Sequence, residues 1–171
     1  LARDGTAEIS AKSIGSVAAQ TGKKLVLTET FGCSGYGVTP KELKLIADKQ
    51  YVYGVDLMCQ HLYNYTFSKL GKIDCPPSFG RIMPWKSFYK SFNDYFSKLG
   101  YMIANSEEKT EVAVVTPMES IYLDYLRLSE DKSRTEVDVP FIGLLSELKK
   151  RGVSYHFINA VSYTHLRAHE T

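Results

Sequence analysis

The stretch that decides the fold is LVLTETFGCSGYGVTPKEL, residues 25–43. Its first three residues are apolar and too few for a helix, so they predict a short, buried and parallel strand. A glycine-rich loop follows, and a helix is predicted to open at Thr39-Pro40-Lys41-Glu42, where a capping box coincides with proline at the first helical position. Strand, loop and capped helix in this order predict one βα unit.

A single carboxylate, Glu29, stands where the predicted strand stops. Barrels built of βα units keep their catalytic groups at the carboxyl ends of their strands. The loop that follows carries three glycines around Tyr36, so both backbone and aromatic ring can approach a ligand closely. This position makes Glu29 the candidate catalytic residue. The alternative is that Glu29 is a solvated loop residue or the partner of an arginine.

The surrounding sequence continues the alternation of strands and helices. Helices are predicted over 8–21, 40–53 and 85–104, and strands over 24–28 and 55–60. The first helix is expected to pack Ile9, Ile14, Val17 and Ala18, and the last to bury Phe88, Phe92, Tyr95, Phe96, Leu99 and Ile103. A long loop over 62–83 carries two tyrosines and paired prolines, and loops of this length are usually functional or disordered. Aromatics and paired prolines favour an ordered loop.

A second unit is predicted after the polar residues 105–110. It begins with a strand over 112–115, continues with helices over 119–128 and 140–151, and returns to a strand over 153–158. This pattern is typical of the start of a doubly wound α/β domain.

Composition gives the chain an ordinary globular character. Of the 171 residues, 44% are hydrophobic and 23% charged, and the formal charge of +2 gives no reason to invoke nucleic acid or an anionic membrane. No apolar run approaches the roughly 20 residues that cross a bilayer. The three cysteines lack metal-site spacing, and their odd number argues against a disulfide framework. The sequence does not decide the cellular compartment of the protein.

Residues 161–171 resemble a translated sequencing adapter and are set aside from fold and site reasoning. Natural sequence is then expected to end near Ala160. This removes His165 and His169, whose spacing of four could otherwise suggest a helical metal pair.

Several short motifs occur in an order that resembles bacterial glycoside hydrolases of the α-L-rhamnosidase-like group. They are TETFG at 28–32, SGY at 34–36, TPKE at 39–42, GVD at 54–56, HLY at 61–63, PPSFG at 76–80 and PW at 84–85. The resemblance implies that residues 1–106 form the C-terminal part of a (β/α)₈ barrel, with its seventh and eighth strands. Residues 107–160 would begin a flavodoxin-like α/β domain. Lys86 departs from the family, which commonly has a second tryptophan there.

The resemblance also implies cleavage of a terminal sugar from a glycan or glycoside by a pair of carboxylates. Glu29 would be the base or nucleophile, and its acid partner would come from an earlier strand. His61, Tyr63, Tyr36 and, more weakly, Trp85 would line the sugar subsite. A lone histidine is more often structural, and each aromatic ring is individually more often packing. No cofactor or metal site is evident, and the sequence does not decide whether the enzyme needs a divalent metal.

Two other functions remain as alternatives: a non-catalytic barrel relative that binds carbohydrate, or an α/β domain that binds a small ligand. The spacing of Gly32, Gly35 and Gly37 matches neither the dinucleotide fingerprint nor the phosphate loop. A piece with only two barrel strands is expected to be inactive by itself and to aggregate through exposed edges.

Overall fold

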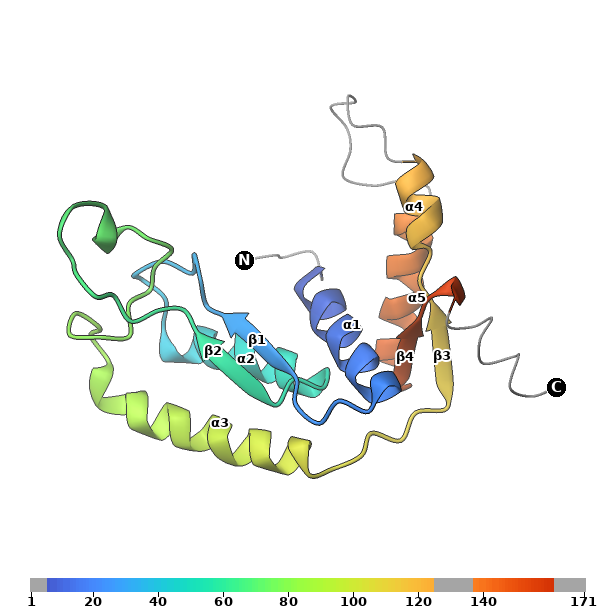
Figure 1. Ribbon diagram of the computed structural model, residues 1–171, viewed down its shortest axis with the longest axis horizontal. Coiled ribbons are helices and arrows are strands. Elements are labelled where there is room, and N and C mark those ends of the chain that lie inside the picture. The colour runs from blue at the N-terminus through green and yellow to red at the C-terminus, as the bar shows by residue number, and fades with distance from the viewer. Residues whose placement is uncertain (1–5, 125–136, 162–171) are drawn as a thin grey trace. The chain divides into compact units, whose positions relative to one another are not determined.

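The computed structural model describes residues 6–124 and 137–161 (Figure 1). The chain divides into two units, Leu1–Glu107 and Glu108–Thr171, and the described residues of each form one parallel sheet of two strands. The first unit consists of α1 (Thr6–Thr21), β1 (Leu27–Thr30), α2 (Pro40–Val52), β2 (Leu57–Gln60), the short 3₁₀ helices η1 (Lys69–Lys72) and η2 (Lys86–Phe88), and α3 (Tyr89–Ala104). No helix in the described ranges has the length and apolar character needed to span a bilayer.

The strands β1 and β2 lie side by side in parallel, from the pair Leu27 and Leu57 to the pair Thr30 and Gln60 (Figure 1). β1 begins three residues later than predicted. Before it, the backbone N–H of Val26 donates to the Asp56 carboxylate at 3.1 Å, so a side chain takes the place of a ladder partner. This shift places Glu29 inside the strand instead of after it.

Helices cover one face of this sheet. The hydroxyls of Thr28 and Thr30 both donate to Oε1 of Gln50 in α2, at 2.8 and 2.7 Å. From β2, Nε2 of Gln60 donates to Oδ1 of Asn93 in α3 at 2.7 Å. The side chains of β1 and β2 alternate between the faces, so every second residue points away from these helices.

On the opposite face of the sheet the described side chains are largely exposed. Leu27 is 55% exposed and its neighbour Leu57 is 48% exposed. Glu29 and Cys59, the next pair on this face, are exposed as well. The strands are parallel as predicted, but the prediction that β1 is buried is wrong for this face.

The capping box predicted for α2 is confirmed. The Glu42 N–H donates to the Thr39 hydroxyl, and the Glu42 carboxylate accepts from the Thr39 N–H and hydroxyl. These bonds to the charged carboxylate lower the pKa of Glu42. Leu43 and Ala47 are fully buried, so the apolar face of this helix forms the centre of the core, with Ile46 packed against it.

Two other apolar stripes differ from the prediction. In α3, Phe92 and Phe96 are buried and Leu99 and Ile103 pack against the core, but Phe88 and Tyr95 are exposed. Phe88 belongs to η2, a separate 3₁₀ turn, so it does not follow the spacing of α3. Tyr95 instead places its hydroxyl at the edge of α2, donating to Asp48 at 3.1 Å.

In α1 the large apolar residues Ile14 and Val17 do not face the protein, although the sequence predicts that they do. Ala11 and Ala18 are buried, whereas Ile14 and Val17 are 44% and 60% exposed. The cause is a close approach at Gly15, where an added Cβ would lie 2.4 Å from the carbonyl oxygen of Tyr53. Only a face of small residues allows a helix to come so near another backbone.

The second unit contains β3 (Val112–Val115), α4 (Met118–Asp124), α5 (Asp138–Lys150) and β4 (Tyr155–Ile158). β3 and β4 pair in parallel, from Val112 with Tyr155 to Val115 with Ile158. This is the strand–helix–helix–strand order predicted from the sequence. The predicted end of the helix at residues 125–128, and residues 162–171 of the adapter-like tail, lie outside the described residues.

Candidate functional site

Glu29 is the third of the four residues of β1, on the exposed face of the sheet. Thr28 and Thr30, on either side of it, point toward α2, so the alternation of the strand directs Glu29 the other way. Its side chain is exposed and stands opposite Cys59 of β2. Within the described residues no arginine or lysine pairs with it, so the carboxylate is open to solvent and to a ligand.

His61 follows β2 and lies next to the end of β1. Its backbone N–H donates to the carbonyl of Thr30 at 2.8 Å, which carries the pairing one step beyond the last register pair. The imidazole lies beside Gly32, whose added Cβ would be 3.6 Å from Cγ of His61. Nδ1 is buried and has no hydrogen-bond partner in the described part of the chain. Because Nδ1 is buried, only the half-exposed remainder of the ring can meet a ligand hydroxyl.

The turn between β1 and the glycine-rich loop is made by Phe31. Its φ of 81° lies in the left-handed region, which bulky residues rarely adopt and which costs of the order of 1–3 kcal/mol. The ring is buried, with its centroid 5.7 Å from that of Phe79 and 6.0 Å from that of Phe92. Burial of the ring offsets the strained backbone. The turn follows Thr30, the last residue of β1, and the sequence does not predict it because no local pattern marks an aromatic residue for positive φ.

The loop after β1 is bound to the long loop after β2. Cys33 N–H donates to the carbonyl of Cys75 at 3.2 Å, and Gly35 N–H to that of Pro76 at 3.0 Å. The hydroxyl of Tyr36 donates to the carbonyl of Lys72. Tyr36 is 43% exposed, so its ring remains accessible while its hydroxyl is held.

Tyr63 lies on the long loop, which is ordered near its ends. The N–H of Leu62 donates to the carbonyl of Pro77 at 3.3 Å, and that of Phe79 returns to the carbonyl of Leu62 at 2.9 Å. Tyr63 is 72% exposed, and its ring rests against Gly80, where an added Cβ would lie 3.4 Å away. The glycine therefore gives the tyrosine room to lie flat on the loop.

Trp85 is placed in the aromatic cluster of the core. Its ring lies 6.2 Å from Phe79 and 6.4 Å from Phe92, centroid to centroid. The indole N–H donates to the carbonyl of Val38 at 3.3 Å, so the polar edge of the ring already has a partner. Trp85 joins the end of the glycine-rich loop to η2, which is a packing role.

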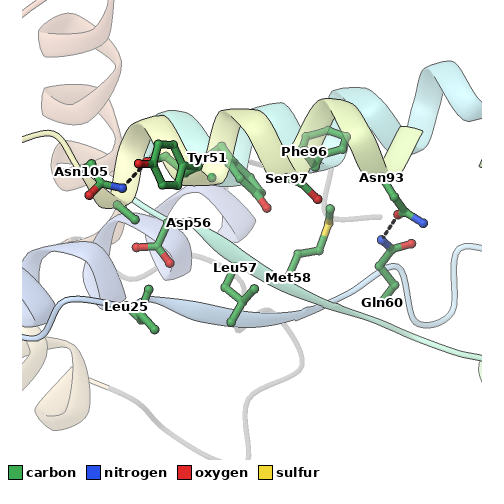
Figure 2. A pocket seen from close by; sticks show the side chains of 13 residues that line it. Leu25, Tyr51, Asp56, Leu57, Met58, Gln60, Asn93, Phe96, Ser97 and Asn105 are labelled. Carbon is green, nitrogen blue, oxygen red and sulfur yellow. Dashed lines mark hydrogen bonds between the residues drawn. The ribbon is translucent and has the colours of Figure 1, made fainter. Parts of the chain in front are cut away.

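The structure thus gathers the loops that carry Tyr36, His61 and Tyr63 at the carboxyl end of both strands, the end at which Glu29 stands. A cavity of about 630 Å³ lies elsewhere, between β2 and α3 (Figure 2). It is lined by Asp56, Gln60, Asn93 and the inner surface of α3, and none of the predicted site residues borders it. No cluster of three His, Cys, Asp or Glu side chains fit to hold a metal ion occurs among the described residues.

Comparison with known proteins finds no relative: no family model, no curated protein and no solved structure matches the chain.

Proposed function

We propose that the chain carries two strands of a (β/α)₈ barrel from a glycoside hydrolase resembling the α-L-rhamnosidase-like group. Glu29 acts in it as the base or nucleophile that cleaves a terminal sugar from a glycan or glycoside. The observation that carries the proposal is the position of Glu29, exposed on one face of the sheet and one residue before the carboxyl end of β1. The motif order described above supplies the family.

The open sheet of the first unit supports a barrel. Parallel strands are normally buried on both faces, whereas β1 and β2 have helices on one face and the exposed Leu27 and Leu57 on the other. In the described residues the sheet has only these two strands, so both of its edges are free. A closed barrel removes such edges and encloses the second face as its interior. Leucines would then fill the barrel, and Glu29 would stand at its mouth.

The chemistry requires a second carboxyl group on another strand. With about 5 Å between the two carboxyl groups, Glu29 attacks the anomeric carbon directly, and with about 6.5–9.5 Å it activates a water. In this proposal the half-exposed imidazole of His61 hydrogen-bonds sugar hydroxyls through Nε2, and the accessible rings of Tyr36 and Tyr63 offer faces for stacking. In this proposal Trp85 contributes by holding the loops, with any contact to sugar limited to its exposed edge.

The test is Glu29→Gln in the complete enzyme, assayed on an aryl α-L-rhamnoside. Loss of the general base or nucleophile is expected to lower turnover by about 10²–10⁴-fold or more. Cys59→Ala is the matched control, because Cys59 is the register partner of Glu29 on the same face. Near-full turnover by a folded Glu29→Gln enzyme would reject the proposal. Sugar binding without any turnover by the parent enzyme would favour the non-catalytic relative instead.

A further inference from the structure

The structure brings together two of the three cysteines, Cys33 and Cys75, which are far apart in the sequence. The N–H of Cys33 donates to the carbonyl of Cys75 at 3.2 Å, and the bond from Gly35 to Pro76 follows two residues later on one segment and one residue later on the other. The side chain of Cys33 also lies near that of Cys75 and raises the pKa of the Cys75 thiol, with smaller contributions from burial and from the charge of Asp74. The backbone and side-chain contacts therefore agree.

We propose that Cys33 and Cys75 form a reversible disulfide that cross-links the loop after β1 to the loop after β2. The bond from the Cys33 N–H to the Cys75 carbonyl brings the backbones of the two residues into direct contact. A disulfide needs Cα atoms about 4.4–6.8 Å apart, and such a direct backbone contact is compatible with that separation. Cys33 is exposed and Cys75 half-buried, and both are free thiols, so an oxidant can reach the pair.

The oxidant is a small-molecule disulfide such as oxidised glutathione. The Cys33 thiolate attacks one sulfur of glutathione disulfide, which gives a mixed disulfide and releases one glutathione thiolate. Cys75 then loses its proton and attacks the Cys33 sulfur, which forms the protein disulfide and releases the second glutathione thiolate. Both thiolates take up the protons that the two cysteines gave up. Cys33 attacks first because its thiol is the more exposed and the raised pKa of Cys75 keeps that group protonated.

The cross-link would fix the segment that holds Tyr36. Its ring stands on the loop that begins at Cys33, and its hydroxyl is bound to Lys72, close to Cys75 in sequence. In the reduced protein these two loops are joined without a covalent bond, by hydrogen bonds and by the packing of Phe31 against Phe79. The disulfide adds a covalent bond between the loops. This bond restricts the unfolded chain and thereby raises the melting temperature of the protein.

Cys59 serves as the internal control. It is also exposed and free, but it lies in β2 as the register partner of Glu29. If exposure alone decided reactivity, Cys59 would form disulfides as readily as Cys33. If the position of each cysteine in the fold decides reactivity instead, only Cys33 and Cys75 form an intramolecular disulfide.

The experiment equilibrates the full chain in glutathione buffers, quenches with acid, alkylates the remaining thiols and maps peptides by mass spectrometry. The expected product is a peptide pair joined at Cys33 and Cys75, with Cys59 alkylated and with Cys59→Ser behaving like the parent. Cys33→Ser and Cys75→Ser should give mixed disulfides with glutathione and no intramolecular bridge. The equilibrium constant for the bridge should fall by about tenfold or more in concentrated guanidinium chloride.

Bridges to Cys59 in amounts comparable with the 33–75 bridge would overturn the proposal, as would equal bridge formation in native and denatured chain. A second measurement is the melting temperature, expected to rise by several degrees on oxidation of Cys59→Ser and to return with dithiothreitol. An unchanged or lowered melting temperature would contradict a bridge that fits the native loops. These readouts do not depend on glycosidase activity.

Discussion

Gly100 of α3 lies directly against the backbone carbonyl of Asp56, the residue that precedes β2. A Cβ added to Gly100 would stand 2.2 Å from the Asp56 oxygen and 3.3 Å from the ring of Tyr51. The backbone of α3 therefore contacts the backbone just before β2, and position 100 tolerates no side chain.

Gly100→Ala is expected to destabilise the first unit by about 1–3 kcal/mol or more, because overpacking outweighs the better helix propensity of alanine. Gly143→Ala is the control, since Gly143 sits inside α5 with nothing within 4 Å of an added Cβ. There the substitution should stabilise its own helix by about 0.5–1 kcal/mol. Urea unfolding followed by circular dichroism measures both, and an alanine at position 100 without cost would contradict the close approach.

Asp56 is expected to stabilise the backbone at the start of β1. It is 8% exposed, and its carboxylate accepts from the N–H of Val26. Asp56→Ala leaves that N–H without an acceptor and should lower the free energy of unfolding by about 1–3 kcal/mol. Asp56→Asn keeps an oxygen in the same place and should lower the free energy of unfolding clearly less than Asp56→Ala. Hydrogen exchange at Val26 provides the local readout: equal protection in all three proteins would contradict the role of the carboxylate.

These contacts mark the limit of what the sequence predicts of the fold. The helix α2 could be predicted because Thr39, Pro40 and Glu42 determine its start through bonds between neighbours. β3 was predicted with its observed bounds because its apolar run is short and ends before Pro117. The limits of β1 could not be predicted, since they depend on the side chain of Asp56, distant in sequence.

The candidate site shows the same division. A carboxylate near the carboxyl end of a strand is visible in the sequence, and Glu29 was selected on that basis. The positive φ of Phe31, the pairing of Cys33 with Cys75 and the packing role of Trp85 all arise from contacts between distant segments. Local patterns carry no signal for them.

The capping box predicts a response to acid. Hydrogen bonds from Thr39 lower the pKa of Glu42 below its usual value of 4.5. A lowered carboxyl pKa gives stability that is present above the unfolded-state value and is lost as the pH falls through the folded-state value. We therefore expect the parent chain to lose more stability than Glu42→Gln between neutral pH and about pH 3. Urea unfolding over that range measures the difference, and parallel pH profiles would contradict the assignment.

Removal of the Thr39 hydroxyl tests the same cap at neutral pH. Thr39→Ala is expected to destabilise the first unit by about 1 kcal/mol, whereas Thr39→Ser keeps the oxygen and should cost less. The measurement is again the free energy of unfolding in urea. If Thr39→Ser and Thr39→Ala lower the free energy of unfolding by the same amount, the Thr39 hydroxyl does not cap the helix.

The core is predicted to depend on α2. Leu43 is fully buried, so Leu43→Ala should lower the free energy of unfolding by about 2–5 kcal/mol through lost apolar contact and a residual cavity. Leu45 lies on the same helix but is 58% exposed, and Leu45→Ala should change stability by less than about 0.5 kcal/mol. Comparable losses in both variants would show that the chain does not pack as described.

The exposed face of the first sheet predicts self-association. Leu27 and Leu57 are about half exposed next to each other, and both edges of the described sheet are free to pair with another copy. Leu27→Lys places a charge on this face without touching the core, and it should shift the chain toward the monomer in sedimentation velocity at matched concentration. Tyr65→Lys is the control, because Tyr65 is fully exposed at 103% but lies on the long loop. It removes a similar apolar surface away from the sheet and should leave the association unchanged. A parent chain that stays monomeric as its concentration rises, or a Tyr65 variant as effective as the Leu27 variant, would show that the sheet face does not drive contact between copies.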